Sequence, residues 1–269
     1  MQGRLLPKYQ GRYQAHPKGY WQNEFSKAAE LGLDCIEFIL DFNDVEANPL
    51  MQQSGIEDIL RRTEETGVKV RTACADYLME APLHHSNEEV AGHSQLVLRR
   101  LLSNGRALGL TDIVIPCVDQ SSIRDRANQD RFEKYLRPLV EDAEAFGINL
   151  SLETDLPPQP FISLLNRFDS NRVTINYDTG NSAAWGFDPA EELACYGKRI
   201  SDIHIKDRVL GGGSVVLGTG STQFDRFFRA LRPINYNGPF IMQVYRDDEG
   251  EGIFKTQLLW IRNQHLVET

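Results

Sequence analysis

The sequence lacks the run of roughly 20 apolar residues that a membrane-spanning helix requires. It opens with MQGRLLPKYQ, which has no apolar stretch typical of a secretory signal peptide. Its four cysteines, Cys35, Cys74, Cys117 and Cys195, form no CxxC pair and lack the spacing of a small disulfide scaffold. These absences predict a cytoplasmic protein with reduced thiols and no membrane partner.

Positive charge is also scarce. The chain has 29 Lys and Arg residues against 38 Asp and Glu residues, and its net charge is −9. Because binding to a phosphate backbone requires a basic face, this composition predicts no nucleic-acid partner. A small anionic substrate needs only a few local cations, so the net charge does not exclude one. No GxGxxG motif follows an early strand, which disfavours a doubly wound dinucleotide-binding sheet.

Short apolar runs alternate with amphipathic stretches along the whole chain. Many of the runs are rich in β-branched residues, and they lie at 35–40, 68–74, 113–118, 148–153, 173–178, 200–205 and 239–245. Runs of this kind are typical of parallel strands that are covered on both faces. The clearest helix is expected over 96–110, where the leucines gather on one face and the arginines lie elsewhere.

This alternation, without a linker or low-complexity segment, predicts an α/β fold of the (β/α)8 TIM-barrel type, with residues 1–269 as one domain. Barrels of this type run to about 250 residues as a single unit. Eight strands are required, and the remaining one must be Met1–Leu5. That segment is unusually short, so either the first strand is truncated or the coding sequence starts upstream.

Polar residues recur at or just after the ends of the expected strands: Glu37, Asp76, Asp119, Glu153, Asp178, His204 and Gln243. Barrel active sites are built at this rim, and a buried charge is costly unless it is paired or bound to a metal. Taken singly, each of these residues has a plain structural alternative, such as a helix cap, an ion pair or a core histidine. Four of them come from the last four strands, namely Glu153, Asp178, His204 and Gln243. Together they predict a site for Mn²⁺, Mg²⁺, Co²⁺ or Zn²⁺ with mostly oxygen ligands.

Five motifs give the C-terminal half a specific resemblance. They are LETD at 152–155, NYDTGN at 176–181, HIKDR at 204–208, LGTG at 217–220 and YNGPFIMQ at 236–243. Their order and spacing resemble those of the xylose isomerase-like TIM barrels, the superfamily of sugar-phosphate isomerases and epimerases and of apurinic endonucleases. The N-terminal half is similar only loosely, through MQGRL, CIEF and ADY.

The resemblance implies a metal-dependent isomerase or epimerase that acts on a sugar or sugar phosphate through an enediolate. In the ketose epimerases of this superfamily, Glu, Asp, His and Glu hold the metal. Glu153, Asp178 and His204 fill the first three positions, and Gln243 stands where those enzymes have the second glutamate. This departure matters because the two glutamates of those enzymes exchange the substrate proton, whereas a glutamine can coordinate but cannot accept a proton.

The resemblance makes Glu153 the expected catalytic base. The owner of the second acid/base role stays open among Asp76, Glu37 and Lys206. Lys206 and Arg208 precede the glycine-rich stretch 211–220, and barrels often bind phosphate with backbone amides in the loops after strands seven and eight.

Those two cations are therefore expected to bind substrate. The alternative is a flexible loop whose cations pair with nearby aspartates. Asn181 and Arg246 are also expected to reach the substrate, although a capping role for Asn181 is equally open.

Other functions fit the same scaffold. A lyase, such as an inosose-type dehydratase, would use the same metal and base, and the missing second glutamate suits it. A non-catalytic barrel that binds sugar or metal is a further alternative. An apurinic endonuclease is disfavoured, because those enzymes have a zinc-binding histidine where this chain has Asn181. The expected partner is a small-molecule sugar or sugar phosphate, and a homo-oligomer is possible.

Overall fold

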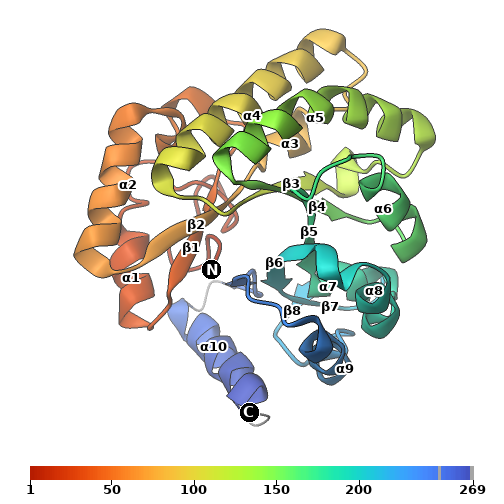
Figure 1. Ribbon diagram of the computed structural model, residues 1–269. Helices are drawn as coiled ribbons and strands as arrows, with labels where there is room; N and C mark the ends of the chain where they lie inside the picture. Colours follow the sequence, from red (N-terminus) through yellow and green to blue (C-terminus); the bar gives the residue numbers. More distant parts are fainter. Residues whose placement is uncertain (248–249, 267–269) are drawn as a thin grey trace.

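The computed structural model describes residues 1–247 and 250–266, and its main element is one parallel sheet (Figure 1). Seven strands are hydrogen-bonded in the order β1-β2-β3-β4-β5-β6-β9. They are β1 (Cys35–Ile39), β2 (Lys69–Cys74), β3 (Asp112–Cys117), β4 (Asn149–Thr154), β5 (Val173–Asp178), β6 (Ile200–Ile205) and β9 (Phe240–Met242). Each overlaps one of the seven apolar runs, so the predicted α/β barrel architecture is confirmed.

Helices connect consecutive strands and surround the sheet (Figure 1). They are α1 (Asn23–Glu30), α2 (Gln53–Thr66), α3 (Tyr77–Glu80), α4 (Glu88–Leu108), α5 (Arg126–Phe146), α6 (Pro158–Leu165), α7 (Thr179–Trp185), α8 (Pro189–Tyr196), α9 (Phe224–Leu231) and α10 (Glu251–Leu266). The expected helix over 96–110 forms the second half of α4 and ends at Gly109 with a φ of 75°. Among the helices described, none is both long enough and apolar enough to cross a bilayer.

A short antiparallel hairpin interrupts this alternation. Its strands are β7 (Asp207–Arg208) and β8 (Ser214–Val215). The glycine-rich stretch 211–220 begins in the hairpin loop and ends in a turn after β8.

The seam between β9 and β1 is closed by the N-terminal residues rather than by a regular eighth strand. The amide of Gln2 donates to the carbonyl of Met242 in β9 at 3.2 Å, and the amide of Glu37 in β1 donates to the carbonyl of Met1 at 2.8 Å. Gly3 then leaves the extended conformation with a φ of 53°, and a Cβ there would lie 2.8 Å from the carbonyl oxygen of Tyr13. The strand expected at Met1–Leu5 is therefore reduced to its first two residues in the described structure.

The hydrophobic core lies between the strands and the surrounding helices. Phe25, Phe132, Phe227 and Phe254 are fully buried there, in α1, α5, α9 and α10. Every residue of β1, β3 and β5 is buried, as expected for strands covered on both faces. One face of these strands packs against the helices, and the other faces the interior of the barrel, where buried polar residues lie.

Candidate active site

Three of the four predicted metal ligands converge at the carboxyl ends of neighbouring strands. Side chains in a strand alternate between its faces, so Glu153 in β4, Asp178 in β5 and His204 in β6 point into the ring while their neighbours in sequence pack outward. Asp178 and His204 are direct partners in the parallel register of β5 and β6. One ligand atom from each of the three buried residues lies within 4.8 Å of the others.

Asp178 has one carboxylate oxygen that accepts hydrogen bonds and one that accepts none. Its Oδ1 accepts hydrogen bonds from the amides of Gly180 and Asn181 at 2.8 Å each, so Asp178 caps the N-terminus of α7. This cap fixes the carboxylate and directs Oδ2 toward His204 Nδ1, 3.9 Å away. Oδ2 is buried and has no hydrogen-bond partner among the described residues.

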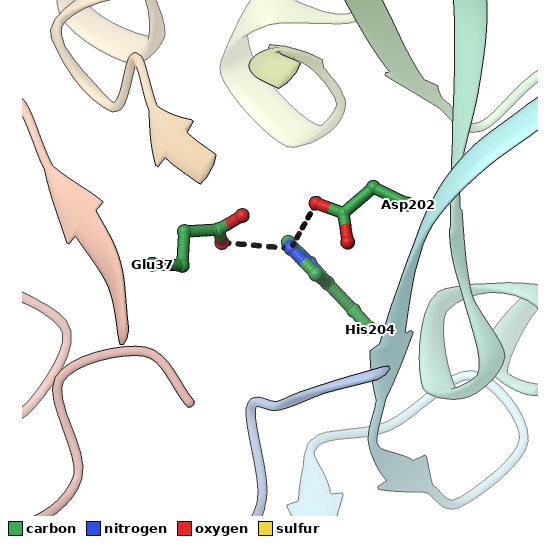
Figure 2. A group of neighbouring side chains, drawn as sticks. All are labelled: Glu37, Asp202 and His204. Atoms are coloured by element: carbon green, nitrogen blue, oxygen red, sulfur yellow. Dashed lines mark hydrogen bonds and ion pairs between the residues drawn. The ribbon is translucent and has the colours of Figure 1, made fainter. Parts of the chain in front are cut away.

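His204 likewise has one ring nitrogen that is hydrogen-bonded and one that is not. Its Nε2 lies 2.8 Å from Glu37 Oε1, and the two side chains point toward each other from different strands inside the barrel (Figure 2). The other Glu37 oxygen accepts from the Thr72 hydroxyl at 2.7 Å. Although burial acts to lower it, the pKa of His204 is raised to about 10 by the Glu37 carboxylate. Nδ1 of His204 is buried without a hydrogen-bond partner in the described part of the chain.

Asp202 lies on the other side of the same ring nitrogen (Figure 2). Its Oδ2 is 4.0 Å from His204 Nε2, and its Oδ1 accepts from the amide of Ile203 at 2.9 Å. Burial, followed by the charge of Glu37, raises the pKa of Asp202 well above its ordinary value. Glu37 and Asp202 thus surround the side of His204 that faces away from Asp178, and they orient the ring.

These residues fit a divalent cation. A buried nitrogen and a buried oxygen that lack hydrogen bonds are costly, and a cation between His204 Nδ1 and Asp178 Oδ2 would satisfy both. A histidine that ligates a metal usually donates its other N–H to a carboxylate, as His204 Nε2 does to Glu37. Two carboxylates and one imidazole suit the metals named above.

Glu153 has the electrostatics of a base that works near neutral pH. Burial, followed by the charge of Asp178, raises the pKa of Glu153 to about 7. Its Oε1 accepts from the side-chain amide of Asn181 at 2.5 Å, and Asn181 Oδ1 accepts from Arg208 at 2.8 Å. Asn181 and Arg208, both expected to bind substrate, therefore hold Glu153 in place.

The fourth predicted ligand, Gln243, lies at the same rim but faces a lysine. Lys206 Nζ donates to Gln243 Oε1 at 2.5 Å and lies 3.5 Å from Asp178 Oδ2. The Gln243 amide nitrogen donates to Gln2 Oε1 at 2.7 Å, and the Gln2 amide donates to Glu37 at 3.0 Å. Lys206 can approach because residue 180 is glycine, where a Cβ would lie 2.7 Å from Lys206 Cγ.

Arg246 is placed differently from the other predicted binding residues. Its guanidinium donates to the carbonyl of Arg4 at 2.7 Å and covers the ring of Tyr13 at 4.9 Å. Arg246 does not line the cavity above the strand ends.

That cavity has a volume of about 750 Å³, enough for a sugar. Its floor is formed by residues at the strand ends, namely Glu153, Asn181, Lys206, Arg208 and Gln243. Part of its wall comes from the segment before β1 and includes Gln10, Arg12 and Gln14. The rest follows β1, β2 and β3 and includes Asp41, Phe42, Asp76, Glu80 and Asp119.

The structure separates the three candidates for the second acid/base. Glu37 is committed to His204, Thr72 and Gln2, and it does not line the cavity. Asp76 and Lys206 both line it. Burial raises the pKa of Asp76, even though hydrogen bonds from Cys74 and Gln14 favour its charged form.

Several cavity residues were not foreseen from the sequence. Gln10, Arg12 and Gln14 lie before the first regular strand, in a segment that has no hydrophobic periodicity and does not align with a strand end. Gln2 was also missed, although it links Gln243 to Glu37. Only the MQGRL segment, which carried part of the resemblance, pointed toward this region.

The fold and the candidate site place the chain in a known class of barrel. The profile of the xylose isomerase-like TIM barrel family matches residues 25–264, and the chain belongs to that family.

Two named relatives align with most of the chain. A 2-epi-5-epi-valiolone 7-phosphate 2-epimerase from an Actinoplanes species is 31% identical over 242 residues, which span 87% of this chain and 86% of that protein. A putative L-ribulose-5-phosphate 3-epimerase from Escherichia coli K12 is 26% identical over 249 residues, with 87% of each chain covered.

Solved structures show the same fold. The apo 3-keto-D-glucoside 4-epimerase of Escherichia coli superposes with a TM-score of 0.74 at 20% identity, covering 90% of this chain and 94% of that one. A xylose isomerase-like barrel from Mycobacterium smegmatis in complex with magnesium gives a TM-score of 0.70 at 20% identity, with 91% and 88% covered. The predicted membership of the xylose isomerase-like TIM barrel family is confirmed.

Proposed function

We propose that the protein is a divalent-metal-dependent epimerase or isomerase of a keto-sugar or sugar phosphate. One observation carries the proposal. At the floor of a polar cavity, Glu153 lies beside a buried histidine nitrogen and a buried aspartate oxygen that have no hydrogen-bond partner among the described residues. The names of the relatives support the same class of reaction.

Glu153, Asp178 and His204 would hold the cation, with Gln243 as the fourth ligand once Lys206 moves off its oxygen. The bound cation supplies charge stabilisation for an enediolate, the high-energy anion formed when a proton leaves the carbon beside a carbonyl.

The chain's own residues perform the proton transfer. Glu153, with a pKa near 7, takes the proton from the carbon beside the substrate carbonyl through one of its carboxylate oxygens. Asn181 and Arg208 hold that carboxylate against the cavity floor. Asp76 and Lys206 are the two other titratable groups at hand for returning a proton from a different direction.

A lyase on the same residues is the second candidate. The position of the second family glutamate holds Gln243 with Lys206 hydrogen-bonded to it, so a proton donor lies where the related epimerases have a base. An ammonium group there suits protonation of a departing hydroxyl β to the carbonyl.

Proton NMR in D₂O with Mg²⁺ present tests the proposal and separates the two candidates. An epimerase or isomerase incorporates deuterium beside the carbonyl and yields a sugar of unchanged composition, whereas a lyase yields a product that has lost water. If neither deuterium uptake nor loss of water occurs with any keto-sugar or its phosphate, the proposed function is wrong.

A further inference from the structure

The glycine-rich turn after β8 uses its backbone amides on a carboxylate of this same chain. Asp207 Oδ2 accepts from the amides of Gly218 and Gly220 at 2.9 Å each, and Oδ1 accepts from the amide of Thr222 at 3.0 Å. Asp207 is fully buried, and a Cβ on Gly220 would lie 2.3 Å from its Oδ1. Converging amides of this kind form an anion site. Here the anion is Asp207, so these amides are not free to bind a phosphate.

The N-terminus of α7 is used in the same way. Its first free amides, from Gly180 and Asn181, are capped by Asp178. In the loop after β6, the seventh strand of the barrel, the amides that could bind phosphate are therefore filled by an aspartate of the chain, and so is the neighbouring N-terminus of α7.

The cations of the cavity are also engaged. Arg12 pairs with Asp41 at 3.0 Å, and Lys206 lies between Gln243 and Asp178. Arg208 is held by two neutral acceptors, Asn181 Oδ1 and the carbonyl of Gly212. Within the part of the chain that the structure describes, Arg208 is the one cation of the cavity lining without a carboxylate partner.

Carboxylates outnumber these three cations. The lining contains Asp41, Asp76, Glu80, Asp119 and Glu153, and Asp178 lies just beneath it. A bound divalent cation would reduce the excess of negative charge without reversing it. Carboxylates accept hydrogen bonds from sugar hydroxyls but repel phosphate oxygens, which are acceptors only. Phe42, 44% exposed at the wall, offers an apolar face to the C–H groups of a sugar ring.

We propose that the substrate is an uncharged keto-sugar or glycoside rather than a phosphate ester. This inference rests on the proposed function and makes it more specific. It separates the chain from its phosphate-named relatives, whose sequences are 26% and 31% identical to it.

Matched pairs of sugars test the inference in phosphate-free buffer at pH 7.5. The pairs are D-fructose with D-fructose 6-phosphate and L-ribulose with L-ribulose 5-phosphate, with inorganic phosphate as a separate probe. Binding is measured by saturation-transfer NMR and turnover by deuterium uptake, both on the Mg²⁺-loaded protein. At least one free sugar should bind, and kcat/KM for the free sugar should exceed that for its phosphate by about tenfold or more, since local charge of one sign changes association rates at least this much.

The two measurements distinguish the possible failures. If a phosphate ester binds or turns over better than its free sugar, or if no free sugar binds at all, the inference is overturned. If a free sugar binds in preference to its phosphate but exchanges no deuterium, the proposed reaction fails while the inference about charge stands.

Rim variants give a matched comparison. Glu80 and Asp119 are exposed on the cavity wall, and E80K with D119N makes the wall more positive by three charges. The control, E30K with E64Q, makes the same change in net charge on exposed residues at the ends of α1 and α2. The rim variant should shift the preference toward the phosphate by about threefold or more, and the control should leave it unchanged. Equal shifts in both variants would contradict the role of the cavity wall.

Discussion

His204 shows how one buried side chain is specified by what surrounds its two nitrogens. Nε2 faces the carboxylates of Glu37 and Asp202, whereas Nδ1 faces Asp178 and has no hydrogen bond within the described residues. The raised pKa of His204 keeps both ring nitrogens protonated when no cation is bound. A cation that binds at Nδ1 would displace the proton there, while the Nε2 proton stays on Glu37. The environment thus fixes which of the two nitrogens is left for a metal.

Replacing Glu37 by glutamine should weaken metal binding without removing a ligand. The hydrogen bond that orients His204 becomes weaker, and the Thr72 hydroxyl faces an amide in place of a carboxylate oxygen. We expect the Kd for Mn²⁺, measured by titration calorimetry, to rise about 10- to 100-fold. Glu192→Gln is the matched control, because Glu192 is a buried glutamate held by Tyr177, Ser182 and Tyr196. An equal rise in that control would assign the effect to general destabilisation.

Replacing Glu153 by glutamine should abolish turnover while some metal binding remains. The amide oxygen can still coordinate a cation, but it cannot accept the substrate proton. The loss in kcat should be about 10²-fold or more, the contribution typical of a positioned base. The measurements are deuterium uptake and Mn²⁺ titration on the same preparation. Turnover at the wild-type rate would show that another group is the base.

Among the elements, the β7–β8 hairpin and its turn depend on one buried carboxylate. Asp207 gathers three amides from Gly218, Gly220 and Thr222, which otherwise would need water in a partly buried turn. Order in this turn therefore comes from an electrostatic contact together with the packing of buried Leu217. Arg208, the residue after Asp207, is held at the cavity floor because it donates hydrogen bonds to the Gly212 carbonyl and to Asn181 Oδ1.

Asp207→Asn should loosen this turn. Asparagine has one acceptor oxygen for three amides, and its NH₂ group would face an amide donor. We expect a loss of roughly 2 kcal/mol in the free energy of unfolding, since hydrogen bonds to charged groups contribute more than neutral ones. Urea denaturation gives the loss, and hydrogen exchange should quicken at 216–222. Asp225→Asn, on an exposed residue at the start of α9, should change neither measurement by a comparable amount.

The strands were predictable because their residues obey a strong local rule. β3 and β5 are buried along their length and contain several β-branched residues. The rule that barrel sites form at strand ends brought Glu153, Asp178 and His204 together from segments far apart in sequence. The first strand was not predictable in this form, because its end depends on a positive φ at Gly3 and on contacts with Met242 and Glu37. The cavity walls before β1 likewise depend on tertiary contacts that no periodicity encodes.

At the scale of the whole molecule, the barrel buries several histidines and carboxylates at a cost that depends on pH. His16 is packed among Trp21 and Phe38, and burial lowers the pKa of its ring to about 4. In the unfolded chain the same ring has a pKa near 6.5. Between these values the unfolded state binds more protons, so stability is complete above about pH 6.5 and is lost as the pH falls toward 4.

The His16→Phe variant should therefore be less sensitive to acid than the wild type. Between pH 7.5 and pH 4 this residue should lower the free energy of unfolding of the wild-type protein by up to about 3 kcal/mol. The variant should lack this contribution to the acid-induced loss. Urea denaturation at the two pH values measures both losses. His93→Gln, on an exposed position of α4, serves as the control and should keep the wild-type sensitivity. Identical pH dependence in all three proteins would show that His16 does not contribute to the loss of stability in acid.

A cation that binds the folded chain should stabilise the whole barrel. At a Mn²⁺ concentration 100 times the Kd, the gain is about 2.7 kcal/mol. It should appear as a rise in Tm that EDTA reverses. Asp178→Asn is the diagnostic variant, because asparagine preserves the cap of α7 but removes the charge. If Mn²⁺ raises the Tm of this variant as much as that of the wild type, the cation binds elsewhere.

The N-terminal closure has a consequence for how the ring moves. Six of its strand pairings are formed between regular strands, whereas the joint between β9 and β1 is spanned by Met1 and Gln2. Gln2 connects Gln243 to Glu37 through both ends of its amide. Because this joint has few backbone hydrogen bonds, we expect any local opening of the barrel to begin there. Such an opening would first displace Gln243 and Glu37, which border the proposed active site. The least regular part of the barrel wall is thus also in direct contact with that site.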